Sequence, residues 1–525
     1  MPLFAKAQAM NLNERALAAL QTCVGSEHLR HHDDARTHAD PYAFGSVHRA
    51  HPGAVVLPAS VEELRAVLAV AREHRLPLWT VSTGRNLGYG GASPRTDGAV
   101  VVDLQRMNRV LEVNEELGYA VVEPGVRFLD LYAHLQQHGH RMLMSVPDIG
   151  WGSPIGNALE RGFGYAPLWD HSAHLCGLEV VMANGRVVRT GMGAMDGNAA
   201  WHLYKGGFGP SLDGLFQQSN LGIVTRAGVN LMRQPESVVT CHVKTASSDD
   251  VAPLVALLRP LLLDGTIQSN AIIGNATVIA SMMSERPRWW SGPGAMPEHA
   301  VAAMADALGL GRWNARFGLY GHPSMTRARA AIVREALQAL PGARIETREY
   351  SGDIDPAKVH PADHAQLGIP GTALVRMAAW RGGTPAHTDF SLVCPATEAH
   401  VTRQLGLIQS TVEAQGFDYA GGFTLGGRHA IALALLSFDK DNADESARVH
   451  TLFEQLIDKS VAAGYAPYRA HPAFMDRISQ AYGFNDHALR DVAESIKNAL
   501  DPLGILSPGK QGIWPGRPGL NKDHT

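Results

Sequence analysis

The chain has little cysteine, no long apolar run and almost no net charge. Its 525 residues include four cysteines, none of them in a C-x-x-C pair, which argues against a disulfide framework and against a zinc site. No run of about 18 apolar residues occurs, so we expect no transmembrane helix. The formal net charge of −4 gives no bulk electrostatic reason to bind nucleic acid or an anionic membrane.

Targeting signals are also lacking. The N-terminal run MPLFAKAQAMNLNERALAAL has no continuous apolar core of a secretory signal, and the final NKDHT is not a peroxisomal tripeptide. We therefore expect a cytoplasmic protein. With 45% hydrophobic and 18% charged residues, the composition is that of a globular chain long enough for more than one core.

The order of predicted elements is α+β. A short strand at 55–58 is followed by a helix that begins after Ser60, and further strands are expected at 78–82 and 100–103. The pattern does not repeat as regular βαβ units. After Pro235 the pattern changes, with a new strand at 240–245 and an apolar-periodic helix at 249–263.

The glycine-rich run from Thr83 to Arg95, TGRNLGYGGASPR, lies between two of these strands. Glycine permits positive φ and close approach of the backbone to a ligand, and successive N–H groups in such a loop can hold a pyrophosphate. The run is neither the G-x-G-x-x-G fingerprint nor a P-loop. From this segment alone, a tight turn between strands is an equally good interpretation.

Several further runs share the order and content of one enzyme family. They are YAVVEPGV at 119–126, SVPDIGWGSPIGN at 145–157, RGFGYAPLWDH at 161–171, DGLFQQSNLGIVT at 213–225, YAPYRAHPAFMD at 465–476 and DPLGILSPGKQGIWP at 501–515. Together with the glycine-rich run, they resemble flavoproteins of the vanillyl-alcohol oxidase and p-cresol methylhydroxylase family, including the eugenol oxidases. The resemblance covers nearly the whole chain.

The resemblance implies FAD as cofactor and a two-domain α+β fold. We expect an FAD-binding domain at 1–236, a substrate-binding cap domain at 237–469, and a return of the chain to the FAD domain at 470–525. The residues expected to contact FAD are Thr83, Gly84, Arg85, Asn86, Gly88, Tyr89, Gly90, Pro147, Asp148, Gly152, Ser153, Gly156, Asn157, Tyr165, Gly222, Ile223, His387 and Lys510.

Tyr89, Tyr468 and Arg469 are the first predicted catalytic group. By the resemblance, they converge on one phenolic oxygen, where two hydroxyls and a guanidinium would stabilise the phenolate and lower the substrate's pKa. A phenolate can push electron density toward its para side chain, which a neutral phenol does poorly. Position in the sequence alone would favour a tyrosine filling a turn for Tyr89, a core tyrosine for Tyr468 and an arginine in a surface ion pair for Arg469.

Asp148, in VPDIGWG, matches the family's catalytic aspartate. A carboxylate there would lie beside the flavin N5 and the reacting carbon, as a base toward water or as a stabiliser of positive charge. The alternative is an Asx-turn residue after Pro147.

His387, in GGTPAHTDFSLV, occupies the position at which family members attach FAD covalently through histidine. The methylhydroxylase branch uses a tyrosine elsewhere in this region. His360 and His364 are weaker candidates for the same bond, and an ordinary strand histidine is the structural alternative.

Two short segments depart from the family pattern. GYAPLWDH carries Leu168-Trp169 where the family has GYTPYGDH, so Tyr165 and His171 are read equally well as flavin neighbours or as core residues. The family's R-E-M-H-H is replaced by Arg428-His429-Ala430-Ile431-Ala432. Without the paired histidines, the substrate end of the cavity is expected to differ.

The expected activity is FAD-dependent oxidation of para-substituted phenols by hydride transfer to flavin N5 through a p-quinone methide, with O2 as acceptor and a homodimer or higher oligomer as assembly. The alternative is a dehydrogenase of the methylhydroxylase type that passes electrons to a cytochrome. A sugar or hydroxy-acid oxidase and a flavin-binding protein with a decayed site are disfavoured by Tyr89, Tyr468 and Arg469.

Overall fold

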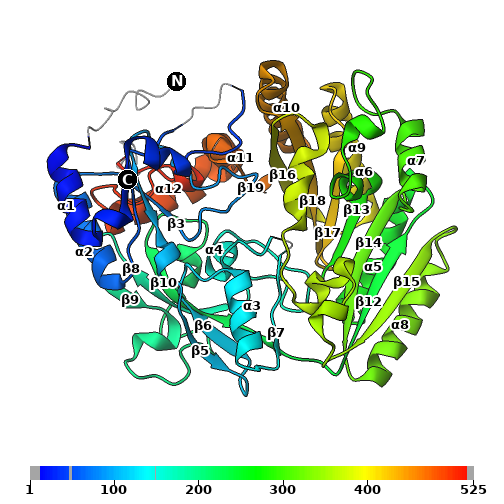
Figure 1. The fold of residues 1–525 in the computed structure, drawn as a ribbon, viewed down its shortest axis with the longest axis horizontal. Coiled ribbons are helices and arrows are strands. Elements are labelled where there is room, and N and C mark those ends of the chain that lie inside the picture. The colour runs from blue at the N-terminus through cyan, green and yellow to red at the C-terminus, as the bar shows by residue number, and fades with distance from the viewer. Residues whose placement is uncertain (1–11, 46–49, 148, 517–525) are drawn as a thin grey trace.

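The computed structural model describes residues 12–45, 50–147 and 149–516. Two halves lie side by side (Figure 1). One half contains the N-terminal segment and the last helices, and the other contains the middle of the chain. The expectation of a two-domain fold of mixed helix and sheet is confirmed. The predicted boundaries at 236/237 and 469/470 stay a prediction.

A four-stranded sheet opens the first half, in the order β1 (Leu29–His31), β2 (Ala54–Val56), β4 (Val100–Asp103) and β3 (Leu78–Val81). Strand β4 runs parallel to both β2 and β3, as the strand–helix–strand order predicts. Helix α2 (Val61–His74) connects β2 to β3 and begins where the Ser60 hydroxyl accepts a hydrogen bond from the Glu63 N–H. Helix α1 (Glu14–Val24) packs against α2.

A five-stranded antiparallel sheet completes the core of this half. Its strands, in spatial order, are β5 (Val110–Asn114), β6 (Tyr119–Val122), β10 (Ile223–Asn230), β8 (Leu175–Val181) and β9 (Val187–Arg189). Helices α3 (Phe128–Gln137) and α4 (Pro154–Leu159) and the small pair β7 (Met142–Leu143) and β11 (Met232–Arg233) accompany it. Most strand residues of β6, β8 and β10 are buried, as expected for strands covered on both faces.

The second half is built on one eight-stranded antiparallel sheet. Its strands, in spatial order, are β15 (Arg344–Ser351), β12 (Ser237–Lys244), β14 (Trp313–Gly321), β13 (Ala271–Asn275), β17 (Ala420–Leu425), β18 (His429–Asp439), β16 (Pro385–Pro395) and β19 (Pro467–Arg469). The last strand, β19, pairs with β16 and places Arg469 opposite Ser391. Tyr468 and Arg469 therefore reach the site on the edge strand of this sheet.

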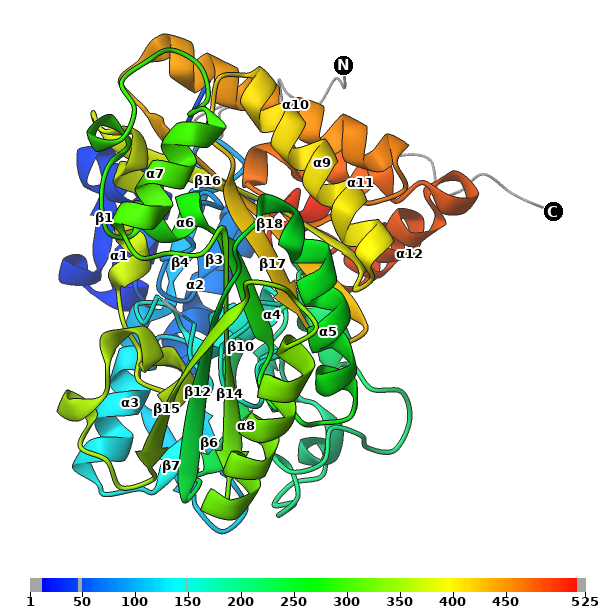
Figure 2. The same cartoon turned by 90° about the vertical axis from the view of Figure 1, so that its right-hand side faces the viewer.

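Helices cover the outer face of this sheet (Figure 2). They are α5 (Val251–Leu263), α8 (Pro323–Leu337), α9 (Glu398–Ala414) and α10 (Ala443–Ala462), with α6 (Ala276–Ser281) and α7 (Glu298–Ala307) nearby. Side chains from α5, α8, α9 and α10 and from alternate strand positions form the largest hydrophobic core, and α6 and α7 contribute to a smaller one. Within the described residues, no helix combines the length and apolar character that crossing a bilayer requires.

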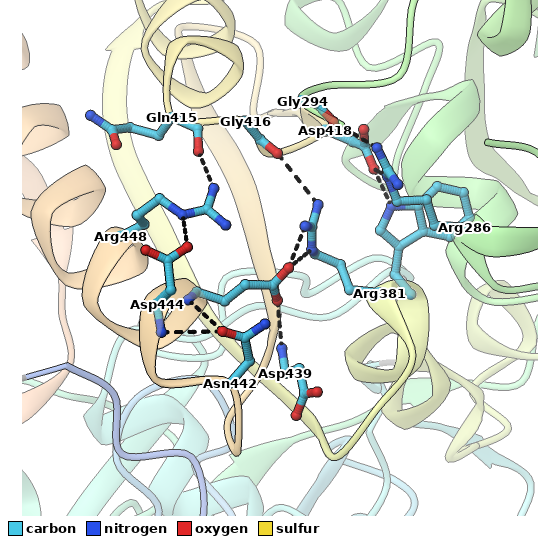
Figure 3. A network of polar contacts seen from close by, with 12 residues as sticks. Arg286, Gly294, Arg381, Gln415, Gly416, Asp418, Asp439, Asn442, Asp444 and Arg448 are labelled. Carbon is cyan, nitrogen blue, oxygen red and sulfur yellow. Dashed lines mark hydrogen bonds and ion pairs between the residues drawn. The ribbon is translucent and has the colours of Figure 1, made fainter. Parts of the chain in front are cut away.

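Buried ion pairs fasten the loops of the second half to its sheet (Figure 3). The Arg286 guanidinium donates to Asp418 Oδ2 at 2.8 Å, and the Trp380 indole N–H donates to the same oxygen at 2.9 Å. Arg381 pairs with Glu445, whose other carboxylate oxygen accepts the Asp439 N–H at 3.0 Å. Each buried charge in this network meets an opposite charge, which offsets the desolvation that burial costs.

The C-terminal segment returns to the first half through α11 (Met475–Ala481) and α12 (Phe484–Leu500), which has non-helical backbone at 485–487. On α12 the buried Lys497 ammonium donates to Asp501 and to the carbonyls of Asn220 and Leu506, each at 2.7 Å. These bonds fix the C-terminal segment against the strand that begins at Ile223.

Candidate active site at the junction of the two halves

The glycine-rich loop lies at the junction and needs its glycines. Gly84, Gly88, Gly90 and Gly91 all have positive φ, between 59° and 85°, a conformation that other residues adopt only at a cost. The Asn86 carbonyl accepts the N–H groups of Tyr89 and Gly91, both at 3.1 Å. The loop therefore closes tightly and directs Tyr89 toward the second half.

A cavity runs from this loop along the first half to the C-terminal segment. Among the residues predicted to contact the cofactor, those that line it are Thr83, Gly84, Arg85, Asn86, Tyr89, Gly152, Ser153, Gly156, Asn157, Gly222, Ile223 and Lys510. Arg469 lines it as well. Most of the predicted cofactor residues are thus gathered in one place.

The cavity wall offers polar atoms that suit a large polar cofactor such as FAD. Within the described part of the chain, Ser219 Oγ and Asn220 Oδ1 are buried, lack a hydrogen-bond partner and belong to residues of the cavity wall. Buried polar atoms are nearly always satisfied in a folded protein, so atoms left open here fit a bound ligand. Lys510, by contrast, already forms a 2.5 Å ion pair with Glu160.

Tyr89, Tyr468 and Arg469 come together as predicted. The Arg469 guanidinium carbon lies 4.4 Å from the centroid of the Tyr89 ring, a distance at which cation and ring attract. The Arg469 charge also acts on Tyr468, and Arg469 Nη2 donates to Asn86 Oδ1 at 2.9 Å. Two phenolic hydroxyls and one fixed positive charge therefore share one corner of the junction.

One face of β16 completes this corner. On a strand, alternate side chains share a face. Ala386, Phe390 and Leu392 belong to the hydrophobic core, whereas His387 and Ser391 approach the glycine-rich loop. The Ser391 hydroxyl lies 3.3 Å from the Tyr89 hydroxyl, and the His387 imidazole lies close to Gly88.

Asp389 lies between those two side chains on the same face of β16. Its carboxylate is 3.8 Å from His387 Nε2. Burial raises the pKa of Asp389, while the nearby His387 and Arg469 act in the opposite direction without cancelling it. Burial lowers the pKa of His387, and the Asp389 charge opposes that shift. Burial therefore favours the neutral form of each partner.

The tyrosines of the corner hold their protons strongly. Burial raises the pKa of Tyr89, and the Asp389 charge raises it further, against the opposing charge of Arg469. Burial also raises the pKa of Tyr468, again against Arg469. Both hydroxyls remain hydrogen-bond donors at any ordinary pH.

The remaining predicted residues are placed differently. Asp148 lies outside the described residues. Gly88 packs against His387 and Asp389, and Gly90 packs against Pro472. The Tyr165 N–H donates to the Val146 carbonyl at 3.2 Å, next to Pro147.

His171, which the sequence leaves open between a flavin neighbour and a core residue, is buried in the first half. Its Nδ1 lies 2.7 Å from Asn157 Oδ1, and Asn157 lines the cavity. Burial lowers the pKa of His171 to about 4, so the ring is neutral at physiological pH. His171 thus supports a cavity residue from behind.

The two departures from the family pattern meet in space. The ring of Trp169 lies 5.9 Å from the ring of His429, and both lie close to Gly426. The two segments that depart from the family pattern are therefore neighbours in space.

Three polar neighbours of the corner were missed from the sequence. Asp389 and Ser391 follow His387 at intervals of two, so strand alternation was the available signal for both. Gln218, whose side-chain amide donates to the Tyr468 carbonyl at 2.9 Å, has no such signal, because it lies 250 residues away in the chain.

Two family models match the chain. The first, "FAD binding domain", matches residues 52–191, and the second, "FAD linked oxidases, C-terminal domain", matches residues 372–511. Together they cover the glycine-rich loop, β16, β19 and the C-terminal segment. The expectation of FAD as cofactor is confirmed.

Known proteins resemble the chain over nearly its full length. The flavoprotein subunit of 4-cresol dehydrogenase (hydroxylating) from Pseudomonas putida is 36% identical over 467 residues, which are 88% of each chain. The structure of 4-ethylphenol oxidase from Gulosibacter chungangensis, an isoeugenol complex, superposes with a TM-score of 0.90 at 35% identity and covers 96% of this chain and 97% of the other.

A second structure, of p-cresol methylhydroxylase with substrate bound, gives a TM-score of 0.90 at 32% identity, with 95% and 96% of the two chains covered. Identity and coverage at this level reach across both halves and the junction between them. This chain is an FAD-linked oxidoreductase that belongs to the p-cresol methylhydroxylase and vanillyl-alcohol oxidase family.

Proposed function

We propose that the protein oxidises para-substituted phenols, with an alkyl, allyl or hydroxymethyl group, at the carbon attached to the ring. One observation carries this proposal: Tyr89, Tyr468 and Arg469 converge beside the cavity. The names of the relatives, which mention 4-cresol and 4-ethylphenol, support the same substrate class.

The corner is suited to a phenolate. Arg469 supplies a positive charge that does not titrate, and the raised pKa values of Tyr89 and Tyr468 keep both hydroxyls protonated as donors. Donors fixed in a buried site stabilise an oxyanion more than water does, because they need no reorganisation. These three residues would bind the substrate in its phenolate form, through the phenolic oxygen.

Bound FAD supplies the oxidising power by accepting a hydride from the ring-attached carbon. The substrate would then be a p-quinone methide, which adds water or loses a proton to give an alkene or aldehyde. Asp148 is proposed to stabilise positive charge on the substrate and to direct water to it.

His387 is proposed to bond covalently to FAD. Its Nδ1 is buried and has no hydrogen-bond partner within the described residues, and the lowered pKa keeps the imidazole neutral, the form with a free lone pair. His364, one of the weaker candidates, already interacts with the Val359 carbonyl through Nε2 at 3.1 Å.

Acid precipitation tests the covalent bond. Wild-type protein should carry the flavin into the pellet, whereas His387→Ala should release free FAD and turn over more slowly. A peptide map with flavin on another residue would overturn the assignment.

The electron acceptor is proposed to be O2, with a cytochrome as the alternative. The relatives' names point both ways, since one is an oxidase and another a dehydrogenase. Stopped-flow reoxidation of the reduced protein in air-saturated buffer, compared with reoxidation by a c-type cytochrome, separates the two.

The visible spectrum of the holoprotein tests the substrate class. Anaerobic addition of p-cresol, 4-ethylphenol, eugenol or vanillyl alcohol should bleach the flavin. Glycolate and a cello-oligosaccharide serve as controls and should not. Bleaching by a control but by none of the phenols would contradict the proposal.

A further inference from the structure

The Asp389 carboxylate is fixed against the loop that carries Tyr89. The Gly88 carbonyl accepts the Asp389 N–H at 3.3 Å and the Thr388 hydroxyl at 2.9 Å. A Cβ on Gly88 would lie 2.4 Å from Asp389 Oδ2, so only glycine allows the carboxylate this position. Strand β16 and the loop therefore hold Asp389 beside the residue that precedes Tyr89.

The carboxylate has few partners for a group in this position. Within the described part of the chain, Asp389 Oδ2 faces His387 Nε2, and the two atoms are 3.8 Å apart, which is too long for a hydrogen bond. A quarter of the Asp389 side chain (25%) remains accessible, against 8% of His387. The carboxylate is thus not fully enclosed by the protein.

A bound phenolate would conflict with an ionised Asp389. Both anions would share the one guanidinium of Arg469, since this charge acts on Asp389 as well as on the two tyrosines. Two negative charges in a buried site do not readily coexist, and such pairs commonly share one proton. The phenol brings that proton with it.

We propose that Asp389 is the base that takes the hydroxyl proton of the phenol as the substrate binds. This inference rests on the proposed function. The phenol O–H bond breaks, its electron pair stays on the oxygen, and an O–H bond forms on the Asp389 carboxylate. The site holds one negative charge before and after, which Arg469 balances in both states, and no oxidation takes place in this step.

The other titratable groups that face this corner are poorer acceptors of the phenol proton. Tyr89 and Tyr468 already hold their protons, and Arg469 has none to gain. The His387 imidazole is kept neutral by burial and is the proposed flavin ligand. The raised pKa of Asp389 brings its basicity closer to that of a phenol, which favours proton transfer.

Proton release on binding tests the proposal. The probe is 4-hydroxybenzaldehyde, which has no alkyl hydrogen to lose and whose phenolate absorbs at longer wavelength than its neutral form. The holoenzyme is titrated at a pH below the pKa of the free phenol, by absorbance and by calorimetry in two buffers of different ionisation enthalpy. Wild type should bind the phenolate with almost no proton released.

Asp389→Asn should either release about one proton per phenolate bound or bind the neutral phenol. Flavin reduction by 4-ethylphenol should slow by about 100-fold at low pH, as expected for a lost general base, and recover as the pH rises. Asp196→Asn, the same change in a fully exposed side chain, is the control and should behave as wild type.

The outcomes separate the inference from the function on which it rests. Phenolate bound by wild type with one proton released would overturn the role of Asp389 and leave the proposed function intact. Neutral phenol bound by wild type would overturn phenolate formation itself. The wild-type proton count can overturn the inference even if Asp389→Asn fails to fold.

Discussion

Two carboxylates in the same half of the molecule behave in opposite ways. Asp363 (in the 3-10 turn Pro361–Asp363) accepts hydrogen bonds from Tyr350 at 2.7 Å and Arg348 at 3.0 Å, and it pairs with His242. Burial raises its pKa, but these partners outweigh burial and lower the pKa to about 2. Asp389, a quarter of whose side chain stays exposed, has fewer partners, and its pKa is raised.

The comparison shows that partners, more than depth, decide what a buried charge does. A carboxylate with every lone pair satisfied stays an anion and holds structure together. One with open lone pairs can exchange a proton with a ligand. The arginines follow the same division. Arg286 is paired with Asp418 and donates to three carbonyls, whereas the direct contacts of Arg469 are with the uncharged Asn86 and Tyr89.

The largest expected effect is on stability, and it comes from removing one partner of a buried ion pair. Arg286→Leu leaves Asp418 buried without its cation, which should destabilise the protein by about 3–5 kcal/mol, as measured by urea unfolding. Arg327→Leu, which removes an exposed ion pair with Glu349, should cost less than about 1 kcal/mol. Equal losses in the two variants would mean that the network in Figure 3 is not the stabilising feature that its burial implies.

Kinetics can decide whether Asp148 is a structural carboxylate or one that acts on the substrate. If its charge stabilises the electron-poor substrate, Asp148→Asn should slow flavin reduction by roughly a hundredfold or more, since such electrostatic effects contribute about 2.7–4 kcal/mol. FAD binding should change far less. Anaerobic stopped-flow with a para-substituted phenol is the measurement, and a rate within about threefold of wild type would make Asp148 a turn residue.

Arg469→Leu tests whether the positive charge of Arg469 stabilises a bound phenolate. Removing a donor to a charged oxygen typically costs about 1.5–3 kcal/mol, which is roughly 10- to 150-fold in the affinity for a phenolate-like inhibitor. The apparent pKa of a bound phenol should rise in the variant, because the positive charge no longer favours the anion. An unchanged pKa of the bound phenol would rule out this role.

The smallest expected effect is the pH dependence of the partnered carboxylate. The pKa of Asp363 falls from 3.8 to about 2 on folding, so its contribution of about 2 kcal/mol is present above pH 4 and is lost as the pH falls through that range. Asp363→Asn should be less stable at neutral pH, and the gap to wild type should narrow toward pH 2. A stability difference between the two proteins that does not change with pH would contradict the lowered pKa of Asp363.

The sequence carried much of this site because its motifs are local. The strand–helix–strand order and the glycine-rich turn follow from short runs of residues, and the placing of Tyr89, Tyr468 and Arg469 follows from the resemblance of such runs to one family. Asp389 was missed although it lies two residues from His387, because no prediction asked which face of the strand each side chain occupies. The Gln218 contact with Tyr468 depends on how distant strands are packed, which local patterns do not encode.

The edge strand β19 has a consequence for biosynthesis. Tyr89 meets Ser391 across 302 residues of chain, and Asn86 meets Arg469 across 383. Contacts of such long sequence separation form late and slowly. The early loop therefore emerges from the ribosome long before its partners exist, and the corner formed by Tyr89, Tyr468 and Arg469 can close only when translation has passed residue 469. We expect cofactor loading to be largely post-translational, with the incomplete pocket exposed to chaperones until then.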